Sequence, residues 1–197
     1  MANLFEHLGE LIAAGIDPVA REAEIFDRYG QTVAVMILDS AGFSRTSEAH
    51  GIVHFLTRLV MMRQIVAPIL EACNNRDFKF EADNVYAVFD HADDAIRASL
   101  EVHDTVRQRK LMLTDHEHFR VCVGIGYGRM LYSETLEGYF GGEMNLACKL
   151  GEDVALGGET LITTAAYENA DPALVKSFTQ KSLRIAGIDA TYFRHQV

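Results

Sequence analysis

Two aspartates follow apolar, strand-like runs in this sequence. Asp39 comes directly after the apolar run 33–38, and Asp83 lies between the strand-like runs 78–81 and 85–89. If these strands are neighbours in one sheet, the two carboxylates lie at adjacent strand ends. Such oxygen ligands suit Mg²⁺ or Mn²⁺, which complete their shells with water and substrate phosphates. Aspartates also commonly cap turns, so the spacing alone leaves both a metal site and a turn-capping role open.

The elements that would position these aspartates follow the order strand, helix, strand, strand, helix, strand. The β-branched run 33–38 predicts a buried central strand, and a long helix is expected over 51–72. After the hairpin, apolar periodicity predicts a helix over 94–107 and a strand over 119–127. This order is typical of an α+β fold of the ferredoxin-like βαββαβ kind. Three later elements are expected: a helix over 142–153, a strand over 160–163 and a C-terminal hairpin over 177–194.

The beginning of the chain predicts two N-terminal helices within 3–29. The second is expected to start at Asp17-Pro18, because Asp is a good N-cap and Pro suits the first helical position. We therefore divide the chain into a helical extension, 1–30, and one larger domain, 31–197. The extension either docks a regulatory partner or only packs against the domain, and the sequence leaves both roles open.

The composition is that of a globular chain of 197 residues, 49% hydrophobic and 23% charged. Its net charge of −10 argues against a nucleic-acid binder, which needs a basic face. The three cysteines, Cys73, Cys122 and Cys148, are far apart in apolar surroundings, which predicts buried free thiols. The first residues lack a signal-peptide pattern, and the apolar stretch 59–70 is short and interrupted by Arg63. We therefore expect a soluble, cytoplasmic protein without a membrane span.

Two further groups contain side chains that can bind metals. His50 and His54 are spaced i, i+4, and the loop 115–118 has the sequence DHEH. The histidine pair has no acid beside it, and the loop is polar and precedes a strand. Both groups are therefore expected to lie on solvated surface.

Five segments resemble, in order, the motifs of class III nucleotidyl cyclase catalytic domains. The run VMILDSAGFS, 35–44, resembles the first metal motif of these adenylyl and guanylyl cyclases, and KFEAD, 79–83, resembles the second. The remaining three are VGIGYG at 123–128, YFGGEMNLACKL at 139–150 and GETLIT at 158–163. The resemblance runs from residue 33 to residue 193, and its specificity comes from the order of the motifs.

The resemblance implies a metal-dependent reaction on a nucleoside triphosphate. Asp39 and Asp83, with the backbone carbonyl of Ser40, would hold two Mg²⁺ or Mn²⁺ ions. The ribose 3′-oxygen would attack the α-phosphorus in line and expel pyrophosphate. In this family the site lies across a homodimer interface. One chain supplies the acids, and the other supplies the contacts to base, ribose and phosphate.

The resemblance also implies nucleotide contacts for five side chains. Lys79 stands where adenylyl cyclases place a purine-contacting lysine and guanylyl cyclases a glutamate, so ATP is the first expected substrate. Asn145 would orient the ribose, and Lys149 occupies the place of an arginine that stabilises the transition state. Arg184 falls near the lysine that grips the triphosphate, and Phe43 of the first motif is also expected to contact substrate.

Three positions depart from the family pattern. Ala82 replaces the glycine before the second metal acid, and Gly138 leaves a base-reading position without a side chain. Lys149 keeps a positive charge but loses the planar fork that binds two phosphate oxygens. Two interpretations remain open. One is an active cyclase with altered base preference, as in the bacterial pyrimidine cyclases that use CTP or UTP. The other is a degenerate cyclase-homology module that dimerises or binds nucleotide without turnover.

Overall fold

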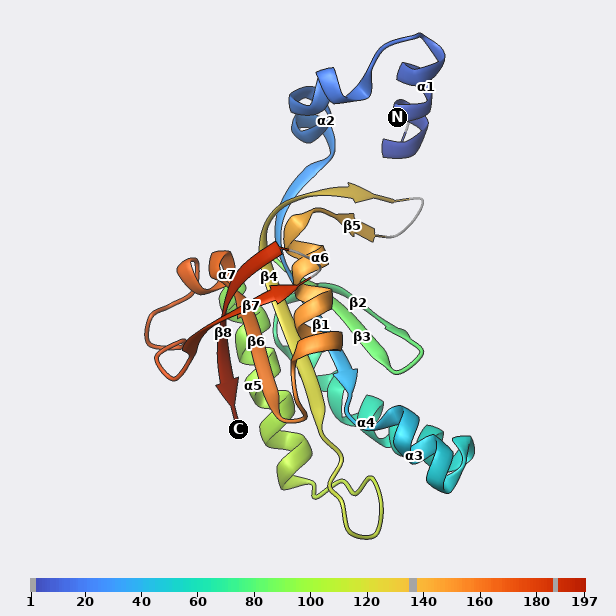
Figure 1. The fold of residues 1–197 in the computed structure, drawn as a ribbon, viewed down its shortest axis with the longest axis vertical. Coiled ribbons are helices and arrows are strands. Elements are labelled where there is room, and N and C mark those ends of the chain that lie inside the picture. Colours follow the sequence, from blue (N-terminus) through green and yellow to red (C-terminus); the bar gives the residue numbers. More distant parts are fainter. Residues whose placement is uncertain (1–2, 135–137, 186–187) are drawn as a thin grey trace.

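A computed structural model describes residues 3–134, 138–185 and 188–197, and Figure 1 shows its fold. The described strands form one sheet in the order β2-β3-β1-β4-β6-β8-β7, with β5 paired to β4. The strands are β1 (Gly30–Ser40), β2 (Asn75–Glu81), β3 (Asn84–Phe89), β4 (Val121–Ser133), β5 (Gly138–Phe140), β6 (Glu159–Thr163), β7 (Thr179–Ile185) and β8 (Ile188–Gln196). The α-helices are α1 (Leu4–Ala13), α2 (Glu22–Tyr29), α3 (Phe43–His50), α4 (Ile52–Ala72), α5 (Ala92–Gln108), α6 (Gly142–Lys149) and α7 (Thr164–Glu168).

The first half of the sheet confirms the ferredoxin-like βαββαβ order. Strands β2, β3, β1 and β4 lie side by side, and α4 and α5 are the crossover helices. Alternate residues of β1 serve opposite faces, as the twofold period of a strand requires. Met36 and Leu38 pack with α4 and α5, whereas Val35 and Ile37 pack with Ala147 of α6. The sheet is therefore covered on one face by α4 and α5 and on the other by α6 (Figure 1).

Helix α4 is the apolar helix that the sequence places after the segment 35–44. By length and composition alone, this helix of 21 residues could cross a membrane. It is longer than the stretch 59–70, which we considered too short to do so. One of its faces packs into the core of the sheet, as is normal for a core helix. The buried side chains of this face are Phe55, Leu59, Met62, Val66, Ile69 and Leu70.

Two of the expected helices have different boundaries in the structure. The second N-terminal helix begins with a 3₁₀ turn, Pro18–Arg21, and α2 follows it. Asp17 is nevertheless the expected cap, because its carboxylate accepts a hydrogen bond from the Val19 N–H at 3.0 Å. The helix expected over 142–153 ends as α6 at Lys149 and continues as a π-helical turn, Leu150–Val154.

The N-terminal helices contact the arm formed by β4 and β5 (Figure 1). Phe5 of α1 packs edge-to-face against Phe140 of β5, with ring centroids 5.6 Å apart. Arg129 of β4 donates hydrogen bonds to the Phe26 carbonyl and to Asp27 of α2. These contacts attach the helices to the arm, and a regulatory partner for them stays a prediction.

Glycines on β4 allow α6 to lie directly against the sheet. A Cβ atom on Gly124 would lie 2.1 Å from the Ala147 carbonyl oxygen, and one on Gly126 would lie 2.5 Å from that of Glu143. The Glu143 carboxylate also accepts hydrogen bonds from the Tyr127 N–H at 3.2 Å and the Thr163 hydroxyl at 2.6 Å. The position of α6 on the sheet is therefore set by close backbone contacts as well as by side-chain bonds.

His103 is a buried polar group in the core between α5 and β6, and it gives a testable pH dependence. Its Nε2 lies 3.0 Å from Thr160 Oγ1, and burial lowers its pKa from 6.5 to about 4. Because the folded pKa lies below the unfolded one, the folded state excludes a proton that the unfolded state accepts. The stability that the folded state has with neutral His103 is fully present above pH 6.5 and is lost as the pH falls toward 4.

The expected loss is on the order of 3 kcal/mol of unfolding free energy between pH 7 and pH 4. Urea unfolding of the native protein and of His103→Gln across this range measures it. The variant should show a smaller fall in stability toward low pH, because glutamine does not titrate. Identical pH dependence in the two proteins would contradict the assignment.

Candidate active site

The structure brings Asp39, Ser40 and Asp83 together at the end of β1. Antiparallel pairing of β1 with β3 places Leu38 opposite Val85, so the last residues of β1 adjoin the β2–β3 turn. The buried Ser40 hydroxyl donates a hydrogen bond to Asp83 Oδ2 at 3.1 Å, and the Ser40 N–H donates to Asp39 Oδ1 at 2.7 Å. The neighbouring strand ends expected for the two acids are therefore present.

The surroundings of Asp39 disfavour its charged form. Burial, followed by the charge of Asp83, raises the pKa of Asp39 from 3.8 to about 6. Cys122 lies opposite Asp39 on β4, and burial together with the Asp39 charge raises the pKa of its thiol to about 12. The thiol therefore stays protonated at neutral pH in the metal-free protein, and Asp39, Asp83 and the Ser40 carbonyl supply oxygen donors at this corner of the fold.

This donor set fits a hard divalent cation with an incomplete protein shell. Within the described residues, no three His, Cys, Asp or Glu side chains are grouped so as to hold a metal ion by themselves. Two carboxylates and a backbone carbonyl leave most of an octahedral shell open to water and substrate oxygens, as Mg²⁺ sites commonly do. A cation between Asp39 and Asp83 would also remove the repulsion that raises the pKa of Asp39.

A third carboxylate near the two aspartates belongs to Glu152, to which we assigned no role from the sequence. It lies in the π-helical turn after α6, and its charge is one of the causes that raise the pKa of Asp39. Its Oε1 accepts hydrogen bonds from Asn84 Nδ2 at 3.2 Å and from the Tyr86 hydroxyl at 3.1 Å. The only indication in the sequence is its place seven residues after Asn145, two helical turns along.

A separate cavity of about 780 Å³ lies between the β2–β3 hairpin, α6 and the β4–β5 arm. Lys79, Asn145 and Gly138 all line it, as the resemblance implies for one nucleotide-binding half of the site. The Lys79 ammonium is 3.3 Å from Glu81 Oε2 and 5.6 Å from the centre of the Tyr86 ring. The cavity thus combines a cation, a carboxylate and an aromatic face on one wall.

Another part of the cavity lining is a hydrogen-bonded group around Gln31. The Gln31 side-chain oxygen accepts from Arg76 at 2.7 Å and from the Tyr139 hydroxyl at 2.9 Å. Arg76 also forms an ion pair with Asp90 at 2.5 Å. These bonds connect β1, β2 and β5, so this part of the lining is fixed before any ligand binds.

The other expected site residues lie outside this cavity. Lys149 follows Asn145 by one helical turn, and its amine is 4.0 Å from Asp153. Arg184 lies on β7, where its exposed side chain is 4.0 Å from Asp189. Phe43, the first residue of α3, packs edge-to-face on Phe55 at 4.7 Å. Asp39 and Asp83 do not line the cavity either, so the acids and the Lys79 cavity lie at two separate places on one chain, which we call the two candidate half-sites.

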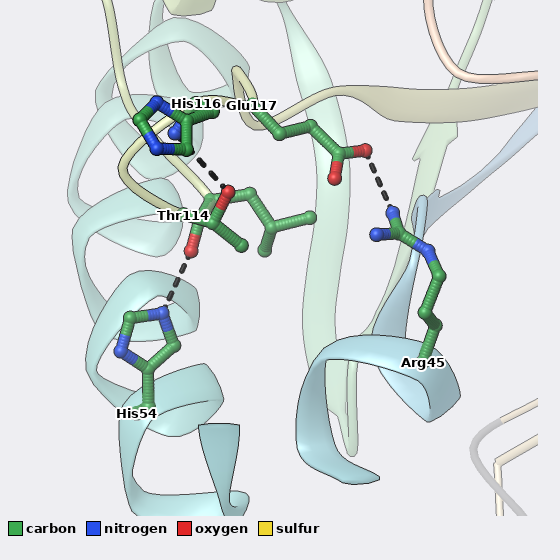
Figure 2. Close-up of polar contacts among 6 residues, drawn as sticks. Arg45, His54, Thr114, His116 and Glu117 are labelled. Atoms are coloured by element: carbon green, nitrogen blue, oxygen red, sulfur yellow. Dashed lines mark hydrogen bonds and ion pairs between the residues drawn. The ribbon is translucent and has the colours of Figure 1, made fainter. Parts of the chain in front are cut away.

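Two of the side chains that can bind metals make structural contacts instead (Figure 2). His54 Nε2 donates to the Leu113 carbonyl at 2.7 Å, and Glu117 forms an ion pair with Arg45 at 2.7 Å. Both contacts connect the loop between α5 and β4 to α3 and α4. His54 is therefore partly exposed, and its ring also anchors the loop, a contact that the sequence did not predict.

No protein-family model matches the chain, and no curated protein sequence matches it. Solved structures do. An adenylate/guanylate cyclase/hydrolase from Silicibacter pomeroyi has a TM-score of 0.69 at 22% identity, over 84% of this chain and 96% of the other.

A rhodopsin-guanylyl cyclase catalytic core with converted specificity, in complex with ATPαS, has a TM-score of 0.68 at 19% identity, over 85% and 97% of the two chains. An adenylate cyclase from Trypanosoma brucei in its monomeric state has a TM-score of 0.63 at 18% identity, over 84% and 88%. The α+β chain therefore has the fold of the class III adenylate and guanylate cyclase catalytic domains.

Proposed function

We propose that this chain is a nucleotidyl cyclase that converts a nucleoside triphosphate, with ATP as the first candidate, to a 3′,5′-cyclic nucleotide and pyrophosphate. The observation that carries the proposal is the proximity of Asp39 and Asp83, joined through Ser40, on a fold shared with such cyclases. One of those structures binds ATPαS, which makes a nucleoside triphosphate the first ligand to test.

The two half-sites support a homodimer as the active form. The acids and the cavity with Lys79 and Asn145 lie at different places on one chain. A second copy related by a twofold axis can bring the cavity of one chain against the acids of the other, and it does so twice. A lone chain is therefore expected to be inactive. We also expect the dimer to act in the cytoplasm, with α1 and α2 as the place where a regulatory partner docks.

In the proposed mechanism, Asp39, Asp83 and the Ser40 carbonyl would hold two Mg²⁺ or Mn²⁺ ions. Such ions would neutralise charge at the triphosphate and lower the pKa of the ribose 3′-hydroxyl. The partner chain's copies of Lys79 and Asn145 hold the base and the ribose, so that the 3′-oxygen faces the α-phosphorus. A bond forms between these two atoms, the bond to the leaving pyrophosphate breaks, and the hydroxyl proton passes to solvent.

The proposal is tested by incubating the purified protein with Mn²⁺ and each of ATP, GTP, CTP and UTP. Cyclic AMP is the expected main product, because the Lys79 ammonium favours the acceptor nitrogens of adenine over the donor edge of guanine. Product from CTP or UTP alone would replace the ATP assignment with a pyrimidine one. No cyclic product from any of the four would contradict the enzyme proposal, with liquid chromatography and mass spectrometry as the measurement.

The second candidate is a degenerate module that binds nucleotide without turnover. It is favoured by the surroundings of Lys149, whose amine lies 4.0 Å from Asp153 on the same helical segment and offers no planar fork to a phosphate.

If this lysine limits an active enzyme, Lys149→Arg should raise kcat by about tenfold or more by restoring a two-pronged phosphate contact. Lys149→Met, which has similar length without charge, should lower kcat. Equal kcat in all three proteins would remove Lys149 from the mechanism.

A further inference from the structure

The turn that carries Asp83 contains an unusual backbone conformation. Ala82, immediately before this aspartate, has φ of 51° and lies in the left-handed region that glycine adopts without cost. For alanine the same conformation costs roughly 1 kcal/mol. Ala82 is exposed, so packing of its methyl group does not compensate. The pairing of Glu81 with Asn84 closes a two-residue turn that requires this conformation, and a second contact supports it.

That contact comes from Arg63, on the face of α4 that is turned toward the hairpin. Its guanidinium donates a hydrogen bond to the Ala82 carbonyl oxygen. The same guanidinium lies over the ring of Phe80, 4.8 Å from its centre, two residues earlier on β2. The Arg63 side chain therefore contacts the hairpin at two points, the Phe80 ring near the end of β2 and the peptide that precedes Asp83.

The two sides of this peptide are held from different elements. The Ala82 carbonyl is held by Arg63 of α4, and the Asp83 carboxylate is held by the Ser40 hydroxyl of β1 at 3.1 Å. If Arg63 is removed, only the pairing of Glu81 with Asn84 opposes relaxation of Ala82 toward a negative φ. Such a relaxation would turn the Cα–Cβ bond of Asp83 and change the direction of its carboxylate relative to Asp39.

We propose that Arg63 is a positioning residue for Asp83, replacing the conformational freedom of a glycine with a clamp on the carbonyl of Ala82. The inference rests on the proposed metal site and deepens it. Arg63 touches neither metal nor nucleotide in this scheme; it acts through the direction of the Asp83 carboxylate. A lysine at position 63 would keep the charge but lose the flat guanidinium that covers the Phe80 ring.

The experiment is a double-mutant cycle with Arg63→Met and Ala82→Gly, read by calorimetric titration of the nucleotide-free protein with Mn²⁺. We expect Arg63→Met to weaken Mn²⁺ binding by about tenfold, as loss of a group that orients a metal ligand commonly does. Ala82→Gly alone should change little. The double variant should regain a large part of the lost affinity, because glycine occupies the required φ without a clamp.

The matched control is Arg58→Met, which removes the same type of side chain from the same helix, at a position where the guanidinium donates a hydrogen bond to Met61 Sδ of α4 at 3.9 Å. It should bind Mn²⁺ as the native protein does. Thermal unfolding without metal shows that each variant is folded, and Arg63→Lys gives a second variant that retains the charge. This lysine variant is expected to bind Mn²⁺ more weakly than the native protein.

Two outcomes separate this inference from the proposed function. Native protein that binds no Mn²⁺ and forms no product would overturn the metal site, and the role of Arg63 with it. Native protein that binds Mn²⁺ with an affinity unchanged in folded Arg63→Met would overturn only the role of Arg63. So would losses that Ala82→Gly does not reduce, because the clamp then would not act through the conformation of residue 82.

Discussion

The Asp39→Asn protein is expected to fold and dimerise while forming no measurable cyclic nucleotide. Asparagine keeps the shape of the side chain but removes the charge that would hold the divalent cation, so catalysis should fall by at least about 10³-fold. Turnover of ATP with Mn²⁺ measures the loss, and Asp83→Asn should reproduce it. Sedimentation of both variants checks that the dimer is intact.

The same substitution is expected to stabilise the metal-free fold. The pKa of Asp39 in the folded protein, about 6, lies above its ordinary value of 3.8. As the pH rises through this window, the unfolded chain releases its proton first, so the folded state loses stability and stays destabilised at pH 7. The asparagine side chain does not titrate, and removing the penalty should add about 1 kcal/mol after allowance for solvent screening.

This combination distinguishes a functional aspartate from a turn cap. Loss of a structural cap lowers stability, whereas loss of a charge held for a metal raises stability and abolishes activity. Asp104→Asn is a suitable control, because Asp104 forms an exposed ion pair with Arg107 outside both half-sites. Full turnover by Asp39→Asn, or a large loss of stability in the metal-free state, would show that the metal assignment is wrong.

Gly124→Ala is expected to have the largest structural effect. The new Cβ would lie 2.1 Å from the Ala147 carbonyl oxygen and 2.5 Å from the Gly151 nitrogen, and both are backbone atoms that cannot swing aside. Helix α6 must move away from β4, which should lower the unfolding free energy by about 3 kcal/mol. Because α6 carries Asn145 and Lys149, activity should fall with it.

Gly9→Ala is the matched control for this substitution. Gly9 lies inside α1, and a Cβ there meets no atom within 4 Å. The helix should gain about 0.5–1 kcal/mol from the better helix former. Urea unfolding of both variants, with product formation as a second measurement, makes the comparison. Native-like stability of Gly124→Ala would contradict the close packing of α6.

Much of the fold could be predicted from local patterns in the sequence. The apolar run 33–38 identified the central strand, and the hairpin with Asp83 at its turn follows from two short strand-like runs around a polar break. Such elements depend on the residues within a few positions, so alternation and turn chemistry describe them well. The positions of these runs then predicted Asp39 and Asp83 at neighbouring strand ends, and the structure brings them together through Ser40.

Contacts between distant segments were decided only by the tertiary structure. Glu152 and Arg63 belong to none of the motifs found in the sequence. Each acts on residues that are far away along the chain. Glu152 approaches Asp39 because a π-helical turn follows α6, and Arg63 reaches the β2–β3 turn because α4 packs under that hairpin.

The two aspartates illustrate the division. The sequence alone determined that they are carboxylates and that they lie at strand ends, since side-chain type and strand periodicity depend only on neighbouring residues. The raised pKa of Asp39, the hydrogen bond from Arg63 to the Ala82 carbonyl and the separation of the acids from the Lys79 cavity were decided by packing. These depend on burial and on charges that only the folded chain brings within a few ångströms of one another.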